Sequence, residues 1–205
     1  VVGGEGIAKD VTVQKKLEDA VRQLAFYDTL TKLPNRRLLN DRLGQVMAAS
    51  KRASSYAALM FLDLDNFKPL NDTHGHDVGD LLLIEVAQRL TDSVREMDTV
   101  ARFGGDEFVV LLGDLGHTEP AARAGVVAEK IRASLSRPYL LSVGQAGTPS
   151  KVVEHHCSAS IGVVVFVNHD LSQEDVLKWA DDAMYEAKEA GRNSIRFHGG
   201  PPATA

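Results

Sequence analysis

The sequence 99-TVARFGGDEFVVLL-112 contains two short apolar segments, 99–103 and 107–112, separated by Gly104 and Gly105. Apolar strands on either side of paired glycines are typical of a tight hairpin, in which glycine supplies the positive φ that the turn requires. Asp106 and Glu107 follow the glycines directly, so this turn carries two adjacent carboxylates. On its own, the pattern is also compatible with a solvated acidic turn.

The segment 56-YAALMFLDL-64 is a continuous apolar run that predicts a buried strand. Asp63 and Asp65 flank Leu64 and project to the same side if the strand continues. Carboxylates from a strand end and an adjacent hairpin are the arrangement by which phosphoryl-transfer enzymes hold Mg²⁺. If the two strands are neighbours, we expect such a site here; the plainer alternative is a strand end followed by an Asp that caps the next helix.

Helices and strands alternate along the rest of the chain. Apolar spacing predicts helices over about 13–27, 36–50, 81–90, 120–135 and 173–190, and strands within 152–167 and 193–197. Residues 1–12 are Gly-rich and weakly patterned. This order predicts an α/β fold of the α+β sandwich type, with a central mixed β-sheet flanked by helices. The pattern does not decide whether the helices cover one face of the sheet or both.

Composition narrows the class of protein. The chain has 205 residues, 44% of them hydrophobic, with 23 basic and 28 acidic side chains and a net charge of −5. This charge argues against a nucleic-acid backbone binder. The single Cys157 suits a reducing compartment. No segment approaches the roughly 18–20 apolar residues of a membrane span, and the start lacks signal-peptide character. We therefore predict a cytoplasmic protein with no membrane contact in this fragment.

Five motifs in order closely resemble the GGDEF family of diguanylate cyclases. They are 28-DTLTKLPNR-36, 63-DLDNFK-68, 71-NDTHGHDVGD-80, 104-GGDEF-108, and a closing pair of 180-ADDAMY-185 and 187-AKEAGRN-193. Lys32 stands where the family often has Gly. The resemblance covers roughly residues 26–198 and implies a palm-like nucleotidyl cyclase fold with the signature on a β-hairpin. We assign residues 27–198 to this domain, residues 1–26 to a signalling linker and residues 199–205 to a disordered tail.

The resemblance implies a metal-dependent reaction in which two GTP molecules condense into cyclic di-GMP and two pyrophosphates. Asp63, Asp106 and the carbonyl of Leu64 are then the expected ligands of Mg²⁺ or Mn²⁺. Asp106, with Glu107 beside it, is expected to help deprotonate the attacking 3′-hydroxyl, and Lys68 completes the expected catalytic set.

It also implies a GTP site. Asn71 and Asp80 match positions that read guanine, whose N1–H and N2–H₂ edge suits a carboxylate acceptor. The other expected GTP contacts are the Asn66 and Phe67 amides, Lys68, Gly104, Gly105, Lys188 and Arg192. Lys188 and Arg192 lie four apart at the end of a helix, where both point one way. The alternative is that they only complement the helix dipole.

Arg95-Glu96-Met97-Asp98 matches the family's inhibitory RxxD motif, which binds the cyclic di-GMP product. A planar guanidinium both bonds phosphate and stacks on a base. Lys130 aligns with a second arginine that often completes this site, so we expect weaker product binding. The plainer interpretation is a surface Arg–Asp pair, which contributes little.

Two histidine groups invite a metal interpretation. His74 and His76, with Asp77 and Asp80, are possible ligands of a transition metal, but the glycine spacing fits a nucleotide-site turn better. The run 155–157, His-His-Cys, precedes a strand and is interpreted as ordinary surface-to-core chain.

The first residues suggest how the domain is regulated. Residues 6–18 weakly resemble the end of a PAS sensor and its signalling helix, which implies an upstream sensor domain. The apolar spacing over 13–27 is typical of a helix that pairs with a copy of itself. Since one domain binds one GTP in this family, the expected active species is a homodimer.

Two competing functions remain open at this stage. A GGDEF domain can bind GTP or cyclic di-GMP without turnover and regulate a neighbouring domain; the intact Asp63 and the intact 104–107 motif favour catalysis instead. Another palm-like nucleotidyl transferase is the third possibility, which the guanine-reading positions and the GGDEF signature argue against.

Overall fold

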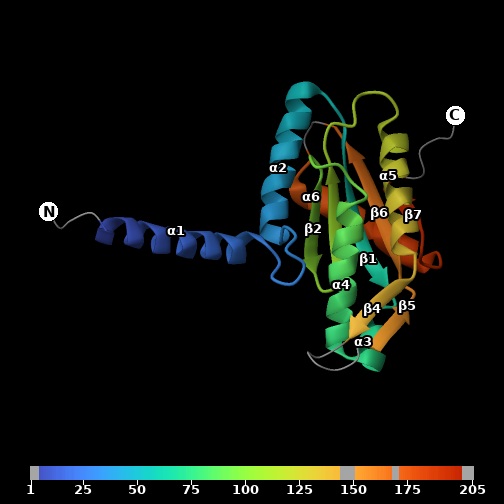
Figure 1. Cartoon of the computed structure of the whole chain (residues 1–205). Helices are drawn as coiled ribbons and strands as arrows, with labels where there is room; N and C mark the ends of the chain where they lie inside the picture. Colours follow the sequence, from blue (N-terminus) through green and yellow to red (C-terminus); the bar gives the residue numbers. More distant parts are fainter. Residues whose placement is uncertain (1–4, 144–150, 168–170, 200–205) are drawn as a thin grey trace.

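A five-stranded sheet forms the centre of the computed structural model, which describes residues 5–143, 151–167 and 171–199 (Figure 1). In order across the sheet, the strands are β2 (Thr99–Gly104), β3 (Glu107–Leu112), β1 (Ala57–Asp65), β6 (Ser158–Phe166) and β7 (Ile195–Phe197). Strand β1 is antiparallel to β3 and β6, whereas β7 is parallel to β6. The predicted mixed sheet is confirmed.

Helices cover both faces of this sheet. They are α2 (Arg36–Ala53), α4 (His76–Thr91), α5 (Pro120–Leu135) and α6 (Gln173–Glu189). Even-numbered residues of β1 pack with α4 and α5, and odd-numbered residues up to Phe61 pack with α2 and α6. All nine residues of β1 are buried, which explains its continuous apolar sequence. Asp63 continues the odd-numbered row, so its side chain lies on the α6 side.

The predicted hairpin is formed by β2 and β3. Of the two glycines, Gly104 ends β2 and Gly105 has the positive φ, 50°. The pairing register shifts between Arg102 and Gly104, so the strand is irregular just before the turn. This irregularity bends the tip of the hairpin relative to the regular ladder.

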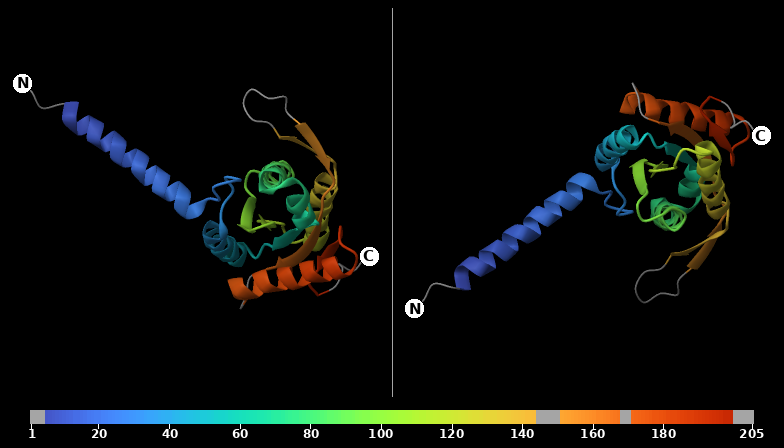
Figure 2. Two further views of the ribbon diagram at one scale, coloured as in Figure 1. Left: turned by 90° about the horizontal axis from the view of Figure 1, so that it is seen from below. Right: turned by 90° about the horizontal axis from the view of Figure 1, so that it is seen from above.

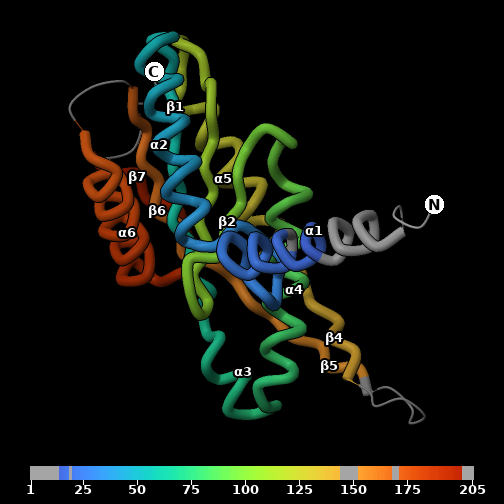
Figure 3. The backbone as a smooth tube through the Cα atoms, turned by 90° about the vertical axis from the view of Figure 1, so that its left-hand side faces the viewer, coloured from blue at the N-terminus to red at the C-terminus, as the bar shows by residue number. Residues whose placement is uncertain are grey.

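Three elements depart from the sequence prediction. Helix α3 (Phe67–His74) was not expected, because eight residues hold too few apolar positions to show a period. The expected strand region 152–167 is two strands, since β5 (Lys151–His155) ends before β6 begins. Strand β5 pairs with β4 (Tyr139–Val143), also not expected, in a separate two-stranded sheet, and this ribbon extends past α4 in Figure 3.

The N-terminal helix α1 (Glu5–Phe26) leads away from the rest of the molecule (Figures 1 and 2). It begins at Glu5, well before the predicted helix start at about residue 13. Leu17, Val21 and Leu24 are 67%, 60% and 68% exposed. Among the described residues, none of the helices has both the length and the apolar character to cross a bilayer. Residues 1–4 and 200–205 of the predicted linker and tail lie outside the described residues.

Candidate active site

The end of β1 and the tip of the hairpin meet, as the sequence predicts. Asp63 lies directly opposite Glu107 in the antiparallel register of β1 and β3. The amide of Leu64 donates a hydrogen bond of 3.3 Å to the carbonyl of Asp106. The sheet therefore gathers Asp63, Asp106 and Glu107 at one edge, which we call the acidic edge.

Negative charges crowd the acidic edge. Burial raises the pKa of Asp63, and the charges of Asp106 and Asp65 raise it further. Burial also raises the pKa of Glu107, with added repulsion from Asp63, Asp181 and Asp106. Mutual repulsion of this kind is relieved by a cation or by protonation.

Lys188 supplies one such cation. Its Nζ lies 2.8 Å from Oδ2 of Asp63 and opposes the rise in that carboxyl's pKa. Helix α6 begins with a capping box formed by Ser172 and Asp175 and places Lys188 in its last turn. The ammonium contacts a carboxylate of the acidic edge, so a role limited to the helix dipole does not describe it.

Arg192 is not part of the helix end. Helix α6 stops at Glu189, and Arg192 lies in the following turn at φ 65°. The prediction that Lys188 and Arg192 share one helical face is therefore wrong, because Gly191, at φ 110°, breaks the helix between them. Both nevertheless lie at the C-terminal end of α6.

Asp65 has a different environment from the acidic edge. It is 2% exposed, and its carboxylate accepts hydrogen bonds from Ser158 Oγ at 2.6 Å, Ser160 Oγ at 2.8 Å and the Asn193 amide at 3.0 Å. It is neither the second carboxylate of a metal pair nor a helix cap. The N-cap of α3 is Asn66, whose side chain makes no capping bond.

The first turn of α3 follows β1 directly. Asn66 has φ 61°, which turns the chain from the strand into the helix. Phe67 is the first helical residue and Lys68 the second, so the first-turn backbone N–H groups, which have no acceptor within the helix, and a lysine follow the end of β1 directly. Such a helix start favours an anion. The predicted phosphate contacts therefore come from two places, the start of α3 and the end of α6.

Asn71 and Asp80 lie on either side of the junction between α3 and α4. Oδ1 of Asn71 is buried and has no hydrogen-bond partner among the described residues. It lies so close to Gly79 that any side chain there would collide with it. Asp80 follows Gly79 and is exposed. A buried amide oxygen without a partner among the described residues and an exposed carboxylate on the next helix are suited to a ligand edge that carries N–H donors.

The donors at the acidic edge suit a hard divalent cation. Asp63 and Asp106 offer carboxylates, and Leu64, the residue after Asp63, offers a backbone carbonyl. Within the described ranges, no group of three or more His, Cys, Asp and Glu side chains is arranged to hold a metal. Mg²⁺ typically binds through one or two carboxylates and completes its shell with water and substrate phosphates. The residues therefore fit a cation that shares its ligands with a nucleotide.

The histidine groups differ in character from the acidic edge. Burial lowers the pKa of His155, and burial raises the pKa of the Cys157 thiol to about 12. The Cys157 thiol donates to the backbone carbonyl of Asp65 at 3.4 Å. A buried, protonated thiol is a poor nucleophile and metal ligand.

The three residues of the predicted inhibitory site line one pocket beside α5. Oδ2 of Asp98 accepts a hydrogen bond of 3.0 Å from the Arg95 amide, which closes a tight turn. Nζ of Lys130 donates to the carbonyl of Ser93 at 3.0 Å and to that of Asp92 at 3.3 Å. Arg95 itself is exposed. The structure thus brings Arg95, Asp98 and Lys130 together.

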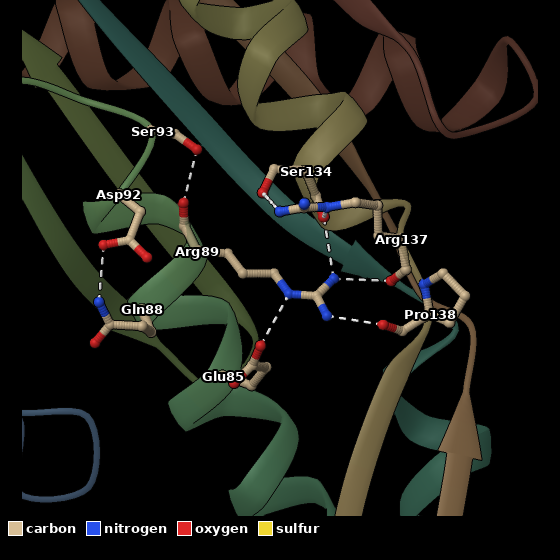
Figure 4. A network of polar contacts seen from close by, with 8 residues as sticks. All are labelled: Glu85, Gln88, Arg89, Asp92, Ser93, Ser134, Arg137 and Pro138. Carbon is tan, nitrogen blue, oxygen red and sulfur yellow. Dashed lines mark hydrogen bonds and ion pairs between the residues drawn. The ribbon is translucent and has the colours of Figure 1, made fainter.

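Arg89 anchors the chain next to this pocket (Figure 4). Its guanidinium contacts Glu85 at 3.1 Å and donates to the carbonyls of Ser134, Arg137 and Pro138 at 2.8 to 3.0 Å. It also stacks 3.7 Å from the centre of the Tyr139 ring. One side chain therefore ties the last turns of α4 to the end of α5 and the start of β4.

Sequence reasoning missed the support of the hairpin. Arg102 makes an ion pair of 3.1 Å with Asp28 and donates to the carbonyl of Gly105 at 2.7 Å. Its backbone amide donates to the carbonyl of Pro34. The two motifs that contain Asp28 and Arg102 are visible in the sequence, but nothing in their spacing pairs residues 74 positions apart. Asp181, whose charge acts on Glu107, was likewise quoted only as part of a motif.

Comparison with known proteins identifies the family of this domain. A model described as "Diguanylate cyclase, GGDEF domain" matches residues 25–194. The bifunctional diguanylate cyclase/cyclic di-GMP phosphodiesterase MucR of Pseudomonas aeruginosa is 44% identical over 175 residues, which are 85% of this chain and 24% of MucR. Diguanylate cyclase TpbB of the same organism is 37% identical over 187 residues, 90% of this chain and 40% of TpbB. The chain thus spans less than half the length of either relative.

A solved structure has the same arrangement of elements. The coiled coil and GGDEF domain of DgcB from Caulobacter crescentus, in complex with c-di-GMP, superposes with a TM-score of 0.78 at 28% identity. The match covers 93% of this chain and 94% of that one, so it extends beyond the domain into α1. The chain therefore belongs to the GGDEF domain family of diguanylate cyclases.

Proposed function

We propose that this chain is an active diguanylate cyclase that condenses two GTP molecules into cyclic di-GMP and two pyrophosphates. The observation that carries the proposal is the acidic edge, where Asp63, Asp106 and Glu107 meet beside Lys188. Carboxylates that repel one another, and so raise each other's pKa, destabilise the fold. A turn with a purely structural role would gain nothing from them.

Asp63, Asp106 and the Leu64 carbonyl would hold Mg²⁺ or Mn²⁺. When bound, the cation neutralises negative charge on the phosphates that react. Lys68, at the start of α3, and Lys188, at the end of α6, would both neutralise the negative charge of these phosphates. In this scheme Lys188 moves from Asp63 to the triphosphate when the nucleotide arrives.

The chemical step is a displacement at the α-phosphorus. A bond forms between the 3′-oxygen of one GTP and the α-phosphorus of the other, and the bond from that phosphorus to the β-phosphate bridging oxygen breaks. The hydroxyl proton passes to the carboxylates of Asp106 and Glu107, and pyrophosphate leaves. The raised pKa of Glu107 suits this role, because a base works best when its pKa approaches the working pH.

In the proposed site, Asn71 and Asp80 select guanine. The buried Oδ1 of Asn71, which lacks a partner among the described residues, accepts one guanine donor, and the Asp80 carboxylate accepts from the N1–H and N2–H₂ edge. Adenine presents an acceptor at N1 and would leave these oxygens unpaired. Sites that bond a specific donor reject analogues that lack it.

One acidic edge holds one GTP, so two copies of the chain must meet. Leu17, Val21 and Leu24 recur at four- and three-residue spacing along α1 and are exposed. This spacing is that of a coiled-coil seam. We infer that α1 pairs with the α1 of a second copy and that a sensor domain upstream controls this pairing. Residues 27–198 form the cyclase domain in this scheme.

Product inhibition is the second part of the proposal. Arg95 and Asp98 offer a guanidinium and a carboxylate to cyclic di-GMP, at the pocket that Lys130 also lines. Two carbonyls already occupy the Lys130 ammonium, and lysine cannot make a bidentate contact. We therefore expect inhibition at higher product concentration than a second arginine would give.

The first test is the product itself. The purified chain is incubated with GTP and Mg²⁺, and the nucleotides are resolved by chromatography beside an Asp106→Asn sample and an ATP sample. We expect cyclic di-GMP and pyrophosphate at a 1:2 ratio from GTP, and neither from Asp106→Asn or ATP. GTP binding without product at any chain concentration would favour the regulatory module instead.

Inhibition is tested with Arg95→Ala. Initial rates are measured with added cyclic di-GMP for the variant and for wild type. The variant should keep the wild-type rate without added product and lose the inhibition. Unchanged inhibition would remove Arg95 from the inhibitory site.

A further inference from the structure

The turn after α6 has an unusual backbone. Gly191, Arg192 and Asn193 have φ values of 110°, 65° and 42°, three successive residues in the left-handed region. Glycine tolerates this conformation, and asparagine does so better than most residues, but arginine has no such advantage. A strained conformation of this kind persists only where the surroundings impose it.

Asp65 holds the turn in this left-handed conformation from the side of the sheet. One oxygen of its carboxylate accepts the backbone amide of Asn193 at 3.0 Å. The carboxylate is itself fixed by Ser158 and Ser160, whose hydroxyls lie 2.6 and 2.8 Å away. Ser160 is fully buried. Asp65 therefore links β1, β6 and the turn at one point.

Helix α5 holds the same turn from the other side. Oδ1 of Asn193 accepts a hydrogen bond of 2.9 Å from the Arg132 guanidinium and one of 3.1 Å from the Ser136 hydroxyl. Backbone and side chain of Asn193 are thus both fixed. Arg192, its neighbour, is exposed, and its guanidinium has no hydrogen-bond or ion-pair partner in the part of the chain that the structure describes.

We propose that Asp65 is a positioning residue, which holds this strained turn so that the free guanidinium of Arg192 is directed to the triphosphate of the bound nucleotide. This inference rests on the proposed function and assigns a role to the second aspartate of 63-DLDNFK-68. Three hydrogen bonds already occupy the Asp65 carboxylate, so it acts through Arg192 and not as a metal ligand.

The test is a double-mutant cycle on nucleotide binding. Affinity for a non-reactive GTP analogue, with a methylene bridge between the α- and β-phosphates, is measured by calorimetry with Mg²⁺. The chains are wild type, Asp65→Asn, Arg192→Ala and the double variant. Asp65→Asn keeps the shape but places an amide donor against donors. We expect about a tenfold loss of affinity in the wild-type background and almost none in the Arg192→Ala background.

Two controls separate positioning from general damage. GMP lacks the outer phosphates, so Asp65→Asn should change GMP affinity less than twofold. Arg132→Ala removes one of the two hydrogen bonds to Oδ1 of Asn193, together with the Arg132–Glu129 ion pair, and leaves the Ser136 bond and the buried Asp65 carboxylate intact. It should weaken analogue binding about threefold, again only when Arg192 is present.

The outcomes are distinct from those of the turnover assay. An equal loss in both Arg192 backgrounds, or an equal loss for GMP, would overturn the positioning role and leave a structural one. Analogue binding that follows the predicted cycle in a chain without turnover would support the positioning role and contradict the cyclase. A wild-type chain that binds no analogue would contradict both.

Discussion

Asp63 and Asp65 lie two residues apart at the end of β1 and differ in almost everything that surrounds them. Asp63 lies opposite Glu107, and burial together with the charge of Asp106 raises its pKa; its one strong partner is Lys188, 2.8 Å away. Asp65 lies opposite Ser158 and accepts three hydrogen bonds from two hydroxyls and an amide. The two carboxylates project to the same side of one strand.

In the proposed cyclase, this difference separates an aspartate that takes part in the reaction from one that supports the site. A carboxylate whose neighbours are other carboxylates gains most from a ligand that brings positive charge. A buried carboxylate that already accepts three hydrogen bonds gains little from a ligand and instead fixes the groups that donate to it. Both positions hold an aspartate on the same side of the same strand, so the residues around each carboxylate decide its role.

The largest expected effect is that of Asp63→Asn. It should lower the rate of cyclic di-GMP formation about 10³-fold or more at saturating GTP, because several kcal/mol of charge stabilisation is lost. The rate is measured beside Asp41→Asn, a change of the same chemistry at an exposed position of α2. Retention of more than a tenth of the wild-type rate would contradict the division between the two aspartates.

Lys188→Met should change two affinities in opposite directions. Affinity for GTP should fall about tenfold, because one cation on the triphosphate is lost. Affinity for Mn²⁺ without nucleotide, measured from the free-ion paramagnetic signal, should rise a few-fold, because the ammonium no longer neutralises Asp63. A fall in Mn²⁺ affinity would show that Lys188 supports the cation site and does not compete with it.

Glu107→Gln should make the chain inactive and more heat-stable. Burial and three neighbouring carboxylates raise the pKa of Glu107, so ionisation opposes folding above that pKa. At neutral pH without metal, the variant should melt roughly 2–4 °C higher than wild type. The gap should close as the pH falls through the raised pKa, because protonation removes the repulsion in wild type. A difference in melting temperature that widens toward low pH would contradict a destabilising ionised Glu107.

The smallest expected effect is that of Ser158→Ala. It removes one of the three bonds to Asp65 and leaves the bond to Asn193 in place. The free energy of unfolding, from urea titration, should fall by about 1 kcal/mol, and GTP affinity should change less than threefold. A larger loss of GTP affinity would mean that the serine, rather than the bond to Asn193, holds the turn.

Local pattern predicted most of the fold for an identifiable reason. These patterns show in the sequence because β1 is buried on both faces and apolar along its length, α5 buries one face, and the hairpin carries the glycine that its turn requires. Helix α3 was missed because eight residues are too few to show a period, and β4 because the exposed Leu140 between the buried Tyr139 and Leu141 hides the alternation in an apolar run. Helix α1 was placed too short because it projects from the core and packs on little of it.

The candidate site was likewise predicted from the sequence only in part. The motifs identified Asp63, Asp106 and Asn71 through resemblance, and the register of β1 and β3 confirms that the acidic residues meet. The role of Asp65 and the Asp28–Arg102 ion pair depend on partners distant in the sequence, 128 positions away for Asn193 and 74 for Arg102. Spacing carries no information about such pairs without a topology.

The most direct test of a dimeric cyclase is the rate of cyclic di-GMP formation per chain, at saturating GTP and Mg²⁺, across a wide range of chain concentration. The same titration is run with a Leu17→Lys, Leu24→Lys variant of α1. We expect the rate per chain to rise with concentration to a plateau, and the curve of the variant to be displaced to higher concentration. A rate per chain that is constant while sedimentation shows a monomer would contradict this expectation, because one acidic edge would then complete the reaction alone.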